Sequence, residues 1–73
     1  MSFNVHVNQY LLEQKGIDCV SILTDLSKPM ELPAMMINYI DSQNHLNSYT
    51  ITRSELNILR KEYRNIIIDD LVN

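Results

Sequence analysis

The sequence predicts a small α+β fold made of one domain over residues 1–73. We expect N-terminal helical segments, one antiparallel β-hairpin over about 35–51 and a long C-terminal helix over about 53–69. Three observations carry this prediction: apolar residues at helical spacing ahead of Gly16, an alternating stretch after a polar turn, and a helix-start signature directly after that stretch. A chain of 73 residues has room for one domain only.

The N-terminal segment has apolar side chains at helical spacing, and Gly16 follows as a helix stop. These side chains are Val7, Tyr10, Leu11 and Leu12. The pattern predicts a helix over about residues 6–15. Alternation over residues 3–7 leaves open a short strand that enters a helix capped by Asn8.

The segment 17–26 fits two structures. Asp18 is suited to cap a short helix whose apolar side carries Ile22, Leu23 and Leu26. A strand through residues 19–23 fits nearly as well, and the helix is favoured. After it, two prolines make residues 28–34 a poor helix, so a loop or an edge segment is expected there.

A β-hairpin follows the prolines. Residues 35–40 are compatible with a strand that is apolar on both faces, and residues 41–44 are typical of a turn. Residues 45–51 alternate, with His45, Asn47, Tyr49 and Ile51 on one side.

The C-terminal helix has the strongest local signal. Thr52 and Glu55 form a capping box, in which the Thr hydroxyl accepts from the N–H of Glu55 and the Glu carboxylate reaches back to the N–H of Thr52. Ile51 and Leu56 have the spacing of a hydrophobic staple. The helix is therefore expected to start at Arg53. Its predicted buried stripe is Leu56, Leu59, Tyr63, Ile66 and Ile67.

Composition narrows the function classes. The chain is 45% hydrophobic with a net charge of −3, which argues against disorder. A single glycine excludes the glycine-rich nucleotide-binding loops and the nucleophile elbow, and we expect a protein without enzymatic activity or cofactor. Neither a signal peptide nor a membrane span is predicted, and one cysteine suits a reducing compartment, so a cytoplasmic protein without a membrane partner is expected.

The metal-ligating and nucleophilic residue types are sparse. His6, Cys19 and His45 are not at ligand spacing, so no metal site is predicted. Cys19 is expected in the core, because neighbouring Asp18 would raise the pKa of its thiol. His45 is expected to face solvent. The adjacent carboxylates Asp69 and Asp70 do not converge on a helix and are expected in a solvated tail.

A basic face on the C-terminal helix is the first candidate partner-binding feature. Its residues recur at intervals of three and four, and they are Arg53, Asn57, Arg60, Lys61 and Arg64. Segment 53–64 has a net charge of +2 in a chain whose remainder has −5. Such a face suits an acidic protein partner or nucleic-acid phosphates, although a sequence pI of about 5.1 weakens the nucleic-acid interpretation. An ordinary solvated helix face is the alternative interpretation.

A methionine-rich segment is the second candidate feature. It contains Met30, Leu32, Met35 and Met36. Methionine adapts its shape and recurs at surfaces that accept partners. The alternative is that these residues fill the core between hairpin and helices.

Three functions follow from these features. The favoured hypothesis is a non-enzymatic protein-binding regulatory module that binds a larger protein or complex. Phage-encoded modulators or inhibitors of host machines such as RNA polymerase are similar to this chain in size and charge. The similarity is one of protein class, and no sequence motif supports it. The alternatives are a small nucleic-acid-binding module that uses the basic face, and a homo-oligomeric structural or assembly protein that associates through the hairpin edge or the methionine-rich segment.

Overall fold

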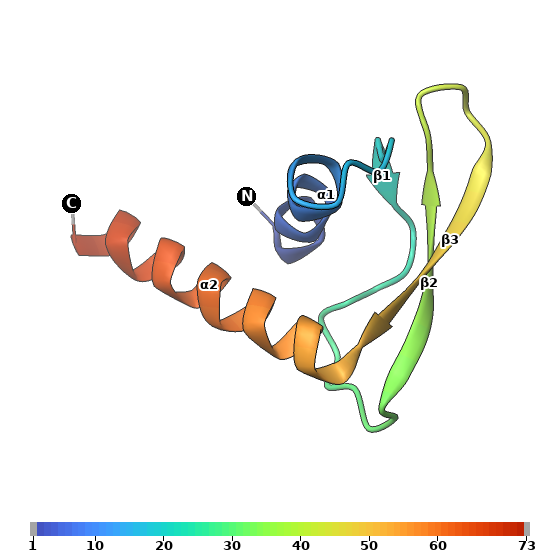
Figure 1. The fold of residues 1–73 in the computed structure, drawn as a ribbon. Coiled ribbons are helices and arrows are strands. Elements are labelled where there is room, and N and C mark those ends of the chain that lie inside the picture. The colour runs from blue at the N-terminus through green and yellow to red at the C-terminus, as the bar shows by residue number, and fades with distance from the viewer. Residues whose placement is uncertain (1, 73) are drawn as a thin grey trace.

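The computed structural model describes residues 2–72, and the side chains of residues 2–69. The elements in chain order are α1 (Phe3–Glu13), β1 (Ser21–Ile22), β2 (Ala34–Ile40), β3 (Leu46–Thr52) and α2 (Arg53–Val72) (Figure 1). The three strands form one antiparallel sheet in the order β1-β2-β3. The predicted α+β class, with its hairpin and long C-terminal helix, is confirmed.

Helix α1 starts three residues earlier than the sequence predicts. Ser2 caps it, with the Ser2 hydroxyl accepting from the N–H of Val5 at 3.2 Å. The helix ends at Glu13, and Gly16 then takes the left-handed conformation with φ of +65°, where glycine has no steric penalty. The alternative strand over residues 3–7 is wrong, because an N-cap at Ser2 already satisfies the first turn of a helix.

The favoured helix over 17–26 is also wrong. This segment contains no helix; it is irregular except at residues 21–22, which form the short strand β1. Its backbone binds β2 instead: the N–H of Val20 donates to the carbonyl of Ile40, and that of Leu23 to the carbonyl of Asn38, both at 2.8 Å. The strand interpretation is therefore the closer one, since pairing with a distant strand has replaced local helical bonds.

The hairpin is confirmed within a residue at each end. Strands β2 and β3 pair without interruption from Ala34 opposite Thr52 to Ile40 opposite Leu46. In the turn, the Asp41 carboxylate accepts from the N–H groups of Gln43 and His45, both at 2.9 Å. This is the local bonding that makes Asp a common turn residue.

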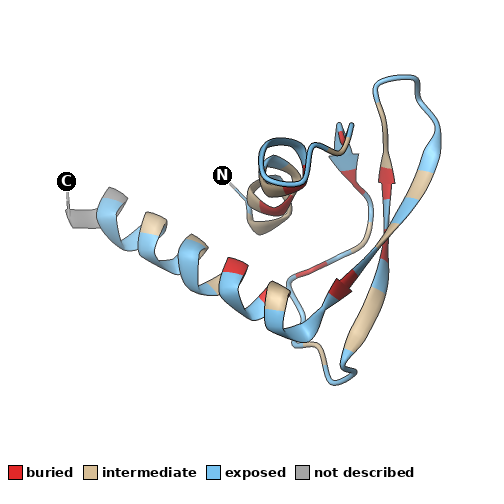
Figure 2. Ribbon diagram, in the orientation of Figure 1, coloured by how far each residue is buried: buried red, intermediate tan, exposed pale blue. Residues whose placement is uncertain are grey.

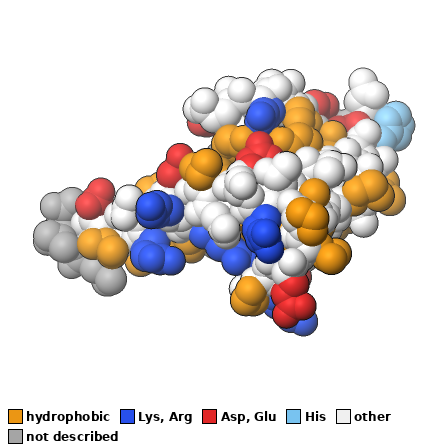
Figure 3. All heavy atoms as spheres, turned by 60° about the horizontal axis from the view of Figure 1, so that its bottom comes forward, with side chains coloured by type: hydrophobic (Ala, Val, Ile, Leu, Met, Phe, Trp, Pro, Cys, Tyr) orange, Lys and Arg blue, Asp and Glu red, His pale blue; other side chains and the backbone are white. Residues whose placement is uncertain are grey.

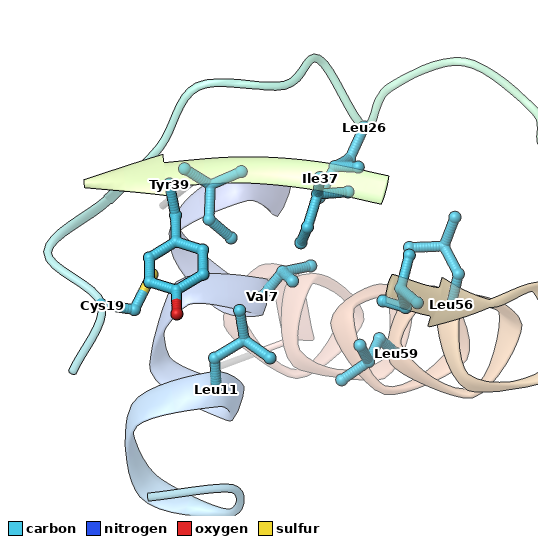
Figure 4. Packing of buried hydrophobic residues seen from close by; sticks show 10 residues of the cluster. Val7, Leu11, Cys19, Leu26, Ile37, Tyr39, Leu56 and Leu59 are labelled. Carbon is cyan, nitrogen blue, oxygen red and sulfur yellow. The ribbon is translucent and has the colours of Figure 1, made fainter. Parts of the chain in front are cut away.

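The two faces of the sheet differ sharply in burial. Ile37 and Ile51 point toward the helices and are 0% exposed, whereas Met36 and Leu46 on the outer face are 65% and 64% exposed. Both helices lie on the inner side, and no described element covers the outer face (Figures 1 and 2). The core lies between the inner face and the helices (Figure 4). It consists of Val7, Leu11, Cys19, Ile22, Leu26, Ile37, Tyr39, Ile51, Leu56 and Leu59.

Helix α2 begins at Arg53, as the capping signal predicts. The Thr52 hydroxyl accepts from the N–H of Glu55 at 3.1 Å, which is one half of the capping box. The other half is wrong, because the Glu55 carboxylate accepts from the hydroxyls of Tyr10 and Tyr49. The carboxylate that the capping box would use locally therefore makes a tertiary contact, while Thr52 remains the N-cap.

The second half of α2 extends beyond the core. Leu56 and Leu59 are each 1% exposed, but Tyr63 and Ile66 are half-buried and Ile67 is 40% exposed (Figure 2). The predicted buried stripe thus holds for the first two turns only. The helix also continues to Val72 rather than ending at about residue 69. Its extension explains a radius of gyration of 12.6 Å, against about 11 Å expected for a compact chain of this length.

Candidate functional site

An apolar groove lies where α2 leaves the core. The N-terminus of α1 packs on the middle of α2, with the rings of Phe3 and Tyr63 5.5 Å apart. Beyond this contact, α2 and the chain at residues 26–27 enclose a groove of about 420 Å³. Its apolar lining is Phe3, Leu26, Tyr63, Ile67 and Ile68, and its polar lining is Ser27, Arg60 and Arg64. We call this the distal groove.

Arg60 holds one wall of the distal groove in place. Its guanidinium donates to the carbonyl of Leu26 at 3.0 Å and to that of Lys28, and it lies 5.8 Å from the centre of the Phe3 ring. These contacts tie α2 to α1 and to the loop before β2. Arg60 was predicted as a partner-binding residue, but its Nη2 already donates to two backbone carbonyls inside the protein.

Arg64 and Lys61 are the cations that remain available beside the groove. No hydrogen bond or ion pair engages either side chain within the part of the chain that the structure describes. Together with Asn57, Ile58 and Arg60 they surround a second hollow of about 380 Å³ on the neighbouring side of α2. Basic and apolar side chains alternate along this face (Figure 3). Arg53 lies apart and donates to the carbonyl of Glu31 at 3.3 Å.

Two carboxylates near the distal groove, Asp25 and Glu62, lie close to polar partners. Asp25 accepts from the N–H and the hydroxyl of Ser27 at 3.0 and 2.7 Å, and these bonds lower the pKa of its carboxyl. Glu62 lies on another side of α2, with its Oε2 3.7 Å from Nε2 of His6. Among the described residues that line the groove itself, the charged ones are Arg60 and Arg64, both cationic.

The methionine-rich segment is divided between two environments. Met30 and Met35 are half-buried and pack against the core, as the alternative interpretation expects. Leu32 and Met36 are each 65% exposed. Met36 lies on the outer face of the sheet, where it lines a hollow of about 460 Å³ with Leu46. The four residues do not form one surface, because the strand alternation of β2 turns Met35 and Met36 to opposite faces.

A polar cluster around Glu55 was not found from the sequence. The Glu55 carboxylate accepts from Tyr49 at 2.9 and 3.0 Å and from Tyr10, and its Oε2 lies 3.4 Å from Nζ of Lys15. Partial burial alone would raise the pKa of Glu55, but the two hydroxyls and Lys15 lower it. Tyr10 is 45 residues away in sequence, so no local spacing could have indicated the contact. The cluster joins α1, β3 and α2 at a partly buried position.

The cluster predicts alkaline instability. Burial, together with the hydrogen bond to Glu55, raises the pKa values of Tyr10 and Tyr49 from 10.0 to about 12. A raised pKa in the folded state gives stability that is complete below the unfolded value and is lost as pH rises through the folded value. We expect the free energy of unfolding to fall between pH 10 and about 12. Urea titrations of the wild type across this range should show it, and Tyr10→Phe with Tyr49→Phe should flatten the dependence. An equal slope in the double variant would contradict this assignment.

The remaining reactive side chains are also accounted for. Cys19 is 2% exposed and its thiol donates to Oδ1 of Asn8 at 2.7 Å. Its burial confirms the core position predicted for it, and burial and then Asp18 raise the pKa of its thiol. His45 is exposed, as predicted. Within the described residues, no group of three or more His, Cys, Asp or Glu side chains is placed to hold a metal ion.

Comparison of the chain with protein-family models, with curated proteins and with solved structures gives no match. Among the described residues, the helices are too short or too polar to cross a membrane.

Proposed function

We propose that this chain is a non-enzymatic, protein-binding regulatory module, and that the distal groove is its partner-binding surface. The observation that carries the proposal is the exposed apolar side chains in the second half of α2. Ile67 and Ile68, 40% and 49% exposed, line a groove whose charged rim is Arg60 and Arg64. Helices in proteins owe most of their stability to packing of an apolar face. A partner that covers these side chains would complete the packing that the chain leaves unfinished.

The chemistry of the groove favours an acidic, amphipathic protein segment. An apolar side of such a segment would fill the groove, and its carboxylates would meet Arg64 and Lys61, which are free of partners among the described residues. This is the helix-in-groove arrangement, in which apolar anchors supply affinity and charges at the rim supply orientation and rate. Five of the eight described residues that line the groove have apolar side chains. The groove therefore suits such a segment better than it suits a phosphate backbone.

Two observations count against nucleic acid as the main partner. The chain has a net charge of −3, and binding driven by counterion release needs many free cations. Arg60, central to the predicted basic face, is occupied by two backbone carbonyls. The size and acidity of the chain support a larger assembly as the partner. Our candidate is bacterial RNA polymerase, because its phage-encoded inhibitors are similar in size and charge.

Affinity capture from nuclease-treated bacterial lysate tests the proposal when the wild type is compared with groove variants and a matched control variant. We expect the wild type to retain one protein or complex in stoichiometric amount, and Ile68→Glu or Arg64→Glu to lose it. Leu12→Glu is the control, because Leu12 is also helical and is 48% exposed, against 49% for Ile68, but does not line the groove. Circular dichroism should show all three variants folded.

Two results would contradict the proposal. Retention of the partner by both groove variants would place the contact elsewhere. Loss of all capture on nuclease treatment, with strong salt dependence of the untreated sample, would favour nucleic-acid binding instead.

A further inference from the structure

The outer edge of β3 is an unprotected pairing surface. β3 lies at one end of the sheet order β1-β2-β3 and is seven residues long, whereas the strand at the other end has two. Proteins commonly protect long edge strands with proline, charged side chains or bulges. The sequence Leu46–Thr52 contains neither proline nor a charged residue, and its register with β2 has no bulge.

The backbone groups that point outward can be identified from the ladder. At one end of the hairpin the N–H of Asp41 donates to the carbonyl of His45, and at the other the N–H of Arg53 donates to the carbonyl of Pro33. Odd-numbered residues on this strand therefore bond to β2, since hydrogen-bonded and non-hydrogen-bonded pairs alternate in an antiparallel ladder. The N–H and C=O groups of Leu46, Ser48 and Thr50 consequently point to the free edge.

The outer face beside this edge is also uncharged. Leu23, Met36 and Leu46 are 57%, 65% and 64% exposed. The polar residues between them are Asn38, Ser48 and Thr50, all exposed. Exposed apolar side chains on an uncovered sheet face mark interaction sites. A face without charge does not repel a copy of itself.

We infer that β3 pairs antiparallel with β3 of a second copy of this chain, forming a two-fold symmetric dimer with a continuous six-stranded sheet. A two-fold interface requires a self-complementary surface, and an antiparallel strand edge is one. Registers that pair even-numbered with even-numbered residues join the free backbone groups. A two-fold axis at Tyr49 overlaps the whole strand and places Ser48 opposite Thr50 of the second copy.

The choice of a second copy over another protein rests on charge and on backbone geometry. A partner selected by electrostatics needs charged groups at the contact. Residues 46–52 have none, so the edge offers backbone bonds and small uncharged side chains that match themselves. The distal groove lies on α2 and shares no lining residue with the β3 edge.

Light scattering of the purified full chain over a range of concentrations tests the inference. We expect a mass of twice 8.5 kDa at high micromolar concentration. Ser48→Lys should reduce the mass to that of the monomer, because edge lysines prevent strand pairing. Thr50→Pro should do the same, since it removes an outward N–H that β2 does not use.

Asn38→Lys is the matched control. Asn38 lies directly opposite Ser48 on the same face but on the central strand, so the same charge is added away from the edge. It should leave the dimer intact, and circular dichroism should show all variants folded. A monomeric wild type would overturn the inference. So would a dimer that survives both edge variants, or one that Asn38→Lys dissociates as strongly as Ser48→Lys, which would assign the contact to the sheet face.

Discussion

Truncation of Leu59 to alanine is expected to lower the free energy of unfolding by about 2–5 kcal/mol. Leu59 is 1% exposed and belongs to the cluster in which α2 meets α1 and the sheet (Figure 4). Removing its side chain leaves a cavity beside Val7 and Leu11 in addition to the lost burial. Urea unfolding followed by circular dichroism should show a much lower midpoint with an unchanged slope.

This loss is a large fraction of the total free energy of unfolding, because the domain has little stability. Domains unfold with about 5–15 kcal/mol, and a chain this short lies near the lower end. Ile58→Ala is the matched control, since Ile58 is the neighbouring residue on the same helix but is 59% exposed. It should change stability by less than about 0.5 kcal/mol. Equal midpoints for the two variants would contradict the arrangement of α2 described above.

Replacement of Glu55 by alanine should cost about 2–3 kcal/mol, because it removes the charged acceptor of two partly buried tyrosine hydroxyls. The Glu55 side chain is 18% exposed, so solvent screens the loss only in part. The variant also removes a carboxylate from the first turn of α2, where the helix dipole favours it. The midpoint of urea unfolding at neutral pH gives the size of the effect.

The pH dependence separates the charge of Glu55 from its shape. Its pKa is lowered from the ordinary 4.5 in the folded state, so its stabilisation is present above pH 4.5 and is lost as pH falls through the folded value. Glu55→Gln keeps the shape and one acceptor oxygen. The stability difference between wild type and Glu55→Gln should therefore shrink in acid. A difference that does not depend on pH would show that the charge of Glu55 contributes nothing.

The elements that could be predicted from the sequence are those specified by neighbouring residues. Thr52 binds the N–H of Glu55 three residues away, and Asp41 binds the N–H groups of its own turn. These contacts are short in sequence, so their residue types and spacing were sufficient to place the start of α2 and the hairpin. The strand alternation of β3 likewise placed Tyr49 and Ile51 on one side of the strand, and the structure shows that this side faces the core.

Long-range contacts decided the rest. Ile22, Leu23 and Leu26 have helical spacing, yet pairing with β2 keeps that segment extended. The stripe of α2 continues to Ile67 in the sequence, but burial stops where the body of the protein ends. Whether a side chain is buried depends on what lies opposite it, which periodicity does not specify.

The candidate site divides in the same way. Spacing of three and four residues predicted one face containing Arg53, Asn57, Arg60, Lys61 and Arg64. The last four line one hollow on α2, whereas Arg53 is not among its lining residues. The tertiary structure decided that Arg60 binds the carbonyls of Leu26 and Lys28, and that Phe3 and Ile67 come together in one groove. Local hydrogen bonds and helix periodicity act over a few residues and can be read from the sequence. The groove depends on contacts between segments dozens of residues apart, and these exist only once the chain has packed.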